Sequence, residues 1–477
     1  MVQPPRCCWR GTLPIHSVSD KCLTLLDAYA EQVLAYGSNL QLAVLAAQAD
    51  PSCCLANTLA GAVCLAAEKK CPRLPPPDPP SSTFLKRAQE QMAAGQCTLY
   101  EQAHLECILA LAAGDVALIL EKHLSLLQDW PQDLVTLKRA QTLAFYVGQQ
   151  DLMLRLAQMV EKANARSPFF HGCLAFALLE AGRVTEAEAA ARAGLALRED
   201  DPWAQHALCH VYHHRCQFEE AVRFMLQRVH QWQHCCPFMY IHNWWHLALC
   251  YVDMGRPQAA LAVFDQHIWK DEWRDQGSTE DCSNGLGLLL RLELRGHGAE
   301  VHARLPALTD RIQNEGLWHV ELLLDVLACW ALPRCGRDAG GRQLLAKMAA
   351  LAEKQKGPRR DALQAGWLRL AEAVSRYAAG DMDEAADGLL ATDWKSLKVI
   401  GASDEQLDVF QELLCSVLLA AGRCHAALRL LQERARERDR VPFTHHLLAR
   451  CRRMCGDEKG AKEAHARASE LEAAYSV

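Results

Sequence analysis

Histidine is the residue type whose number and spacing in this sequence most suggest chemistry. Eight of the 20 histidines fall in the segment 203–246. On a helix, His206 and His210 would lie one turn apart, as would His242 and His246. Such imidazoles can bind zinc, copper, nickel or iron when a facing helix completes the coordination. They can also hydrogen-bond a peptide or a small molecule, or pack as purely structural residues.

A repeat of 34 residues defines the elements that must position these histidines. Gly114, Gly148, Gly182 and Cys216 each follow the previous one by 34 residues, with an apolar run at helical spacing on either side. A fixed period of this length is typical of stacked helix–turn–helix units. We therefore predict an all-α fold, a right-handed superhelical solenoid of antiparallel helix pairs of tetratricopeptide type.

Small residues recur where the two helices of each predicted unit must cross closely. One unit runs from Pro168 to Asp201, the next begins at Pro202, and the following one, with its turn at Gly255, is shifted by five residues. Two late units turn at Gly380 and Gly422. The predicted small positions are Ala175, Ala187, Cys209, Ala221, Ala248, Ala260, Ala373, Ala385, Cys415 and Ala427.

The predicted domain organisation is simple. An N-terminal segment, 1–18, precedes one continuous helical-repeat solenoid, 19–477, whose most regular repeats span 99–270. A proline-rich segment, 71–83, is expected to be a surface loop because proline interrupts helices. The first helix should start after a Ser19 cap and end at Gly37, and no strand is expected.

The register of the repeat assigns the histidines to one surface. Counted from the start of their units, five histidines occupy slots of the first helix that face the concave groove of a tetratricopeptide solenoid. The predicted groove contains Trp203, His206, His210, His213, His242, Asn243, Trp245 and His246. If the groove holds a metal ion, its expected ligands are His206, His210, His242 and His246.

Three functions are compatible with these residues. The first is a binding protein that holds a peptide, a protein segment or a small molecule in the groove. The second is a metal-dependent hydrolase, which also needs a general base, and Asp281, Glu293 and Asp325 are candidate carboxylates. The third is a plain protein–protein scaffold. The familiar nucleotide-binding and hydrolase motifs are missing, so the sequence alone establishes no enzyme.

Composition argues against several classes of partner. The formal net charge of −6 disfavours nucleic-acid binding, which needs a basic face. No apolar run is long enough for a membrane span, and the N-terminus has no secretory signal. The 22 cysteines are then best interpreted as reduced core residues of a cytoplasmic protein.

The segments DPWAQHALCH and HNWWHLALCYVDMG resemble the tetratricopeptide repeat protein 38 family, and the resemblance extends over roughly 15–450. It implies an all-helical cytosolic repeat protein and adds Asp281 and Asp325 to the predicted groove. The residues that match the family are His206, His210, His242, His246, Asp281 and Asp325. This chain differs from the family pattern at three positions, where His213 replaces a Glu, Asn284 an Asp, and Leu327 a His.

Overall fold

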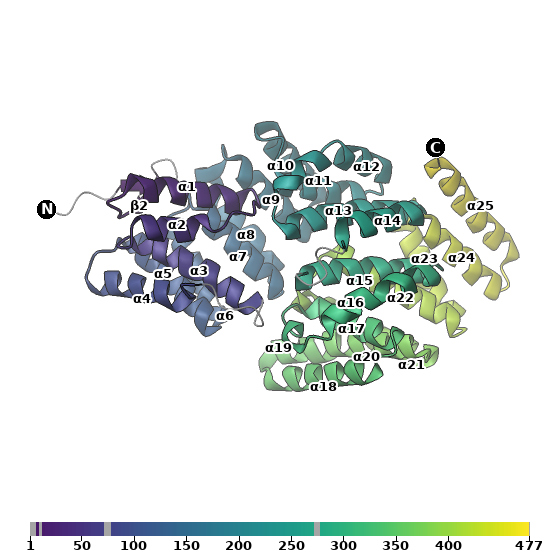
Figure 1. Ribbon diagram of the computed structural model, residues 1–477. Helices are drawn as coiled ribbons and strands as arrows, with labels where there is room; N and C mark the ends of the chain where they lie inside the picture. Colours follow the sequence, from purple (N-terminus) through teal and green to yellow (C-terminus); the bar gives the residue numbers. More distant parts are fainter. Residues whose placement is uncertain (1–5, 9–11, 71–77, 271–276, 477) are drawn as a thin grey trace. The chain divides into compact units, whose positions relative to one another are not determined.

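Helices follow one another along almost all of the chain in the computed structural model (Figure 1). The structure describes residues 6–8, 12–70, 78–270 and 277–476. Successive helices joined by tight turns pack against each other, as α9 (Pro168–Glu180) does against α10 (Val184–Leu197). The predicted all-α, tetratricopeptide-like fold class is confirmed.

The chain forms two compact units. The first comprises 1–145, 150–208 and 231–239, and the second 146–149, 209–230 and 240–477. Helix α11 (Pro202–His214) and helix α13 (Pro237–Asp253) both begin in the first unit and continue into the second.

The first unit has a helical core that Phe84, Tyr100 and Leu126 help to fill. Its elements are β1 (Arg6–Cys8), β2 (Leu13–Ile15), α1 (Asp20–Leu34), α2 (Leu42–Ala49), α3 (Cys54–Lys70), α4 (Ser81–Ala93), α5 (Leu99–Ala113), α6 (Val116–Asp129), α7 (Leu134–Tyr146), α8 (Gln150–Asn164), α9, α10 and the 3-10 segment η1 (Val229–His234).

The second unit continues the helix pairs. Its elements are α12 (Phe218–Leu226), α14 (Pro257–Val263), the π-helical η2 (Phe264–Ile268), α15 (Thr279–Leu294), α16 (Gly298–Ile312), η4 (Glu315–Leu317), α17 (Leu322–Arg334), α18 (Asp338–Lys354), α19 (Gly357–Ala362), η5 (Leu363–Leu368), α20 (Arg369–Ala379), α21 (Met382–Ala391), η6 (Trp394–Ile400), α22 (Asp404–Ala420), α23 (Cys424–Glu437), α24 (Pro442–Met454) and α25 (Glu458–Tyr475).

The turns of the 34-residue repeat have the left-handed backbone conformation that ends helices. The φ angles are 74° at Gly114, 77° at Gly148, 71° at Gly182 and 53° at Cys216. Glycine adopts this conformation without steric cost, whereas Cys216 does not. The ten predicted small positions are at most 3% exposed, as close helix crossings require. The five-residue shift before Gly255 accompanies η1, which lies between α12 and α13.

Two expectations for the N-terminal region were wrong. The strands β1 and β2 pair antiparallel, although no strand was expected. Three-residue strands are too short to show an alternating pattern in the sequence. Helix α1 has the predicted Ser19 cap but ends at Leu34, because Tyr36 has a φ of 54° and Gly37 forms a β-bridge with Cys235.

Residues 71–77 of the predicted proline-rich loop lie outside the described residues, as do 1–5 and 9–11 of the N-terminal segment. The predicted loop was too long at its C-terminal end, because residues 81–83 are the first residues of α4, whose N-cap is Pro80. No helix in the described parts of the chain has both the length and the apolar composition that a membrane span needs.

Candidate metal centre

Three of the predicted histidines converge in the second unit. His210 lies on α11, and His242 and His246 lie on α13. Each offers a ring nitrogen, and these three nitrogens lie within 4.8 Å of one another. All three side chains are buried, as is that of His206, one turn before His210 on α11. We call His210, His242 and His246 the histidine centre.

Two ring nitrogens of α13 face each other directly. The Nε2 atoms of His242 and His246 are 3.3 Å apart, and the two rings meet at 85°. A proton or a cation must lie between two such nitrogens. Two nitrogens on one tetrahedral zinc ion are about 3.4 Å apart, given Zn–N bonds of about 2.05 Å. The spacing therefore suits a shared hydrogen bond or a shared metal ion.

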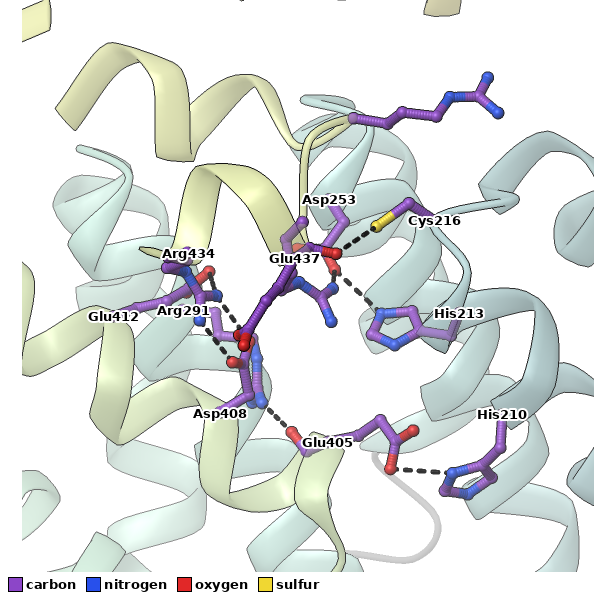
Figure 2. Close-up of polar contacts among 12 residues, drawn as sticks. His210, His213, Cys216, Asp253, Arg291, Glu405, Asp408, Glu412, Arg434 and Glu437 are labelled. Carbon is purple, nitrogen blue, oxygen red and sulfur yellow. Dashed lines mark hydrogen bonds and ion pairs between the residues drawn. The ribbon is translucent and has the colours of Figure 1, made fainter. Parts of the chain in front are cut away.

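Two Nδ1 atoms of the centre have oxygen acceptors that fix the tautomer of their rings. His210 Nδ1 lies 2.8 Å from Oε2 of Glu405, which is on α22 (Figure 2). His242 Nδ1 lies 3.3 Å from Oδ1 of Asn284, which is on α15. When Nδ1–H donates to an oxygen, Nε2 keeps its lone pair for a metal.

The charges around the centre also favour a cation. Burial raises the pKa of the Glu405 carboxyl, but His210 beside it outweighs that effect and holds the pKa at about 2. Burial and the nearby His210 lower the pKa of His242 to about 3. At neutral pH, Glu405 is therefore an anion and His242 a neutral imidazole, the form that binds metals.

Tryptophans pack against the imidazoles. Trp245 stacks on His242 with centroids 5.4 Å apart and rings tilted by 12°. Trp203 stacks on His206 in the same way, at 4.4 Å and 12°. Asn243 beside them is fully buried. Of the ten residues assigned to the groove, Trp203 alone is partly exposed and the other nine are buried.

His213, the fifth histidine, has a different environment. Its Nε2 lies 2.9 Å from Oδ2 of Asp253, at the end of α13. Asp253 also accepts hydrogen bonds from Arg295 at 3.0 Å and Arg438 at 2.6 Å (Figure 2 shows the His213 contact). His213 is thus part of a buried ion network.

The three candidate carboxylates have local partners. Asp281 forms a capping box with Ser278 at the start of α15. Asp325 accepts from both the backbone N–H and the ring of His319, at 3.0 and 2.9 Å.

Glu293 is bound to three side chains of α17 and α20. Its Oε1 accepts from Trp330 and Arg334 at 3.1 Å and from Tyr377 at 2.8 Å. Its hydrogen-bonding oxygen is thus already occupied by structural partners.

Sequence reasoning missed Glu405 and gave Asn284 no role. Glu405 is far along the chain from the histidines, and no motif surrounds it, so no local pattern indicates the contact. Asn284 was singled out as a departure from the family pattern, and the structure places it against His242.

No family model matches this chain. Solved structures that are similar to it include the human IFIT1 dimer with m7Gppp-AAAA, at 11% identity and a TM-score of 0.37, covering 95% of this chain and 91% of that one. The Cut9–Hcn1 hetero-tetramer of the APC/C matches at 12% identity and a TM-score of 0.36, covering 95% and 87%. The P58(IPK) TPR domain matches at 13% and 0.23, covering 78% and 93%. Superpositions this loose carry no argument about ligands or partners.

Proposed function

We propose that this helical-repeat protein binds a transition-metal ion, with Zn²⁺ fitting best, at the histidine centre. The observation that carries the proposal is the 3.3 Å separation of the His242 and His246 Nε2 atoms, within a group of three buried histidines. Imidazole suits zinc, copper, iron and nickel, and three histidines are a ligand set that holds zinc in proteins.

The surroundings support a cation at this position. The Glu405 carboxylate lies 2.8 Å from Nδ1 of His210 and so holds that ring in place. The same carboxylate supplies a buried negative charge that offsets part of the charge of the ion. Asn284 orients His242 in the same way. Each contact leaves Nε2 available as the coordinating atom.

Burial favours an ion over a larger ligand. A peptide in a groove needs exposed side chains to contact, and nine of the ten groove residues are buried. A single ion needs only the small space between ring nitrogens.

We further propose that the resemblance to the tetratricopeptide repeat protein 38 family reflects this centre. His210, His242 and His246, which converge, are three of the four histidines that match the family. Asp281 and Asp325, which also match, have capping and ring partners of their own.

The test is the metal content of full-length protein prepared without a histidine tag. We expect bound zinc or a related ion by mass spectrometry, with about one equivalent less in His210→Ala and His246→Ala than in wild type. The matched control is His214→Ala, because His214 is exposed on the same helix as His210. Wild-type protein with under a tenth of an equivalent, even after incubation with Zn²⁺, would sink the proposal.

A second readout separates loss of metal from loss of fold. Because an ion that binds only the folded state raises its stability, a chelator should lower the melting temperature of wild type and of His214→Ala. The same chelator should lower the melting temperature of His210→Ala by less than that of the other two proteins. An equal response from all three proteins would contradict a metal at this site.

A further inference from the structure

A second group of potential ligands lies near the C-terminus, within the second unit. Cys424 is the first residue of α23, His425 follows it, and Cys455 caps the end of α24. The two sulfurs and one ring nitrogen of His425 lie within 4.8 Å of one another. Helices α23 and α24 pack together, so the chain itself holds the three side chains close.

The distances fit a soft metal ion. Cys424 Sγ is 3.7 Å from His425 Nδ1. A sulfur and a nitrogen on one tetrahedral zinc ion are about 3.6 Å apart, given Zn–S bonds of about 2.3 Å and Zn–N bonds of about 2.05 Å. Thiolate sulfur with imidazole nitrogen is a ligand set that zinc prefers.

A third cysteine lies near these three residues. Cys451 is one helical turn before Cys455, and its thiol donates to Cys424 O at 3.2 Å. Three sulfurs and one imidazole form the tetrahedral shell of one type of structural zinc site, so Cys451 is a candidate for the fourth position.

The site is open to an ion, and one neighbouring cation is already paired. His425 is exposed, and Cys424 and Cys455 are partly exposed. The neighbouring Arg423 is held by Asp387 at 2.5 Å and Asp383 at 3.2 Å. An ion that enters the site can therefore contact sulfur and imidazole without displacing Arg423.

We propose that Cys424, His425, Cys451 and Cys455 form a zinc site that joins α23 to α24. The ion forms coordinate bonds to the sulfurs and to the imidazole, and the thiol protons leave to solvent. This site shares no residue with the histidine centre, so either can exist without the other.

Cobalt substitution tests the proposal in full-length, tag-free, reduced protein stripped of metal. Co²⁺ bound by thiolates gives a sulfur-to-metal charge-transfer absorption band, which an all-nitrogen site cannot give. We expect this band in wild type and in His210→Ala, and its displacement by Zn²⁺. We expect its loss in Cys424→Ser and Cys455→Ser, with one equivalent less of bound zinc.

Two further variants keep the test decisive. Cys335→Ser is the matched control, because Cys335 is also a partly exposed cysteine that caps a helix of the same unit. It should keep the band. His425→Ala removes an exposed side chain that the fold does not need and should weaken Co²⁺ binding. Absence of the band in wild type, or its persistence in Cys424→Ser and Cys455→Ser, would overturn the proposal.

Discussion

Asp133 is a buried carboxylate on which the first unit depends. It accepts hydrogen bonds from Tyr100 at 2.9 Å and from the hydroxyl of Thr136 at 2.6 Å, and it lies 3.0 Å from His104 Nε2. Burial raises its pKa, but these partners outweigh that effect and lower the pKa to about 2. The ionised form is therefore the one that the fold stabilises.

We predict that Asp133→Asn lowers the free energy of unfolding of the first unit by about 2 kcal/mol at pH 7, because charged hydrogen bonds are lost. A carboxyl whose pKa falls on folding stabilises the protein above its unfolded pKa, near 4. The difference between wild type and variant should therefore shrink as the pH drops from about 4 to about 2. Urea unfolding over that range measures it.

The control is Asp129→Asn, since Asp129 is exposed near the end of α6. It should change stability by less than about 0.5 kcal/mol at either pH. An equal effect of the two substitutions would refute the role given to Asp133.

Single residues also show what the sequence could and could not predict at the candidate site. The helical spacing predicted His206 and His210 on one face of a helix, and both lie on α11 and are buried. The same spacing also predicted His213 in the groove, and its Nε2 lies 2.9 Å from Oδ2 of Asp253. The spacing of residues along a helix determines the face on which a side chain lies. The residue that this side chain contacts depends on which distant segment packs against that face. Glu405 was missed for the same reason.

Among the structural features, the turns between helices could be predicted best. Glycine tolerates the left-handed conformation, so its recurrence marks the turns: Gly255, Gly380 and Gly422 all have positive φ. Short elements were not predictable. The strands β1 and β2 have three residues each, and η1 has six. Their apolar residues are too few to establish a period.

Gly296 and Gly298 provide a matched test of these turns, because a Cβ at either position would meet no atom within 4 Å. Gly296 has a φ of 90°, whereas Gly298 is the first residue of α16. We predict that Gly296→Ala costs about 1 kcal/mol, through backbone strain alone. Gly298→Ala should be neutral or slightly stabilising. Thermal unfolding of both variants decides the matter, and equal melting temperatures would contradict the account.

In the second unit as a whole, distant segments are joined by buried ions. Arg434 of α23 binds Asp408 at 2.6 Å and Glu412 at 2.9 Å, both on α22 (Figure 2). Arg291 of α15 donates to the backbone oxygen of Glu405. The backbone of Glu405, whose side chain holds His210, is therefore also held by a buried arginine. The sequence indicated none of this, because charges along one helix do not reveal partners on another.

Arg438 is the member whose removal tests the network best. It lies 2.6 Å from Asp253, with 15% of its side chain exposed. We predict that Arg438→Ala destabilises the second unit by about 3 kcal/mol, because it leaves a buried carboxylate short of one partner. Arg436→Ala, at an exposed position on the same helix, should cost less than about 0.5 kcal/mol. Similar unfolding midpoints for the two variants would show that the network contributes little.

The central claim concerns the ion at the histidine centre, and anomalous X-ray diffraction from zinc-loaded crystals tests it most directly. Diffraction data collected at X-ray energies above and below the zinc absorption edge differ in their anomalous signal, and this difference locates zinc specifically. We predict an anomalous peak about 2.1 Å from the Nε2 atoms of His242 and His246. Zinc-loaded crystals with no peak there, and with the two Nε2 atoms sharing a hydrogen bond, would contradict the account.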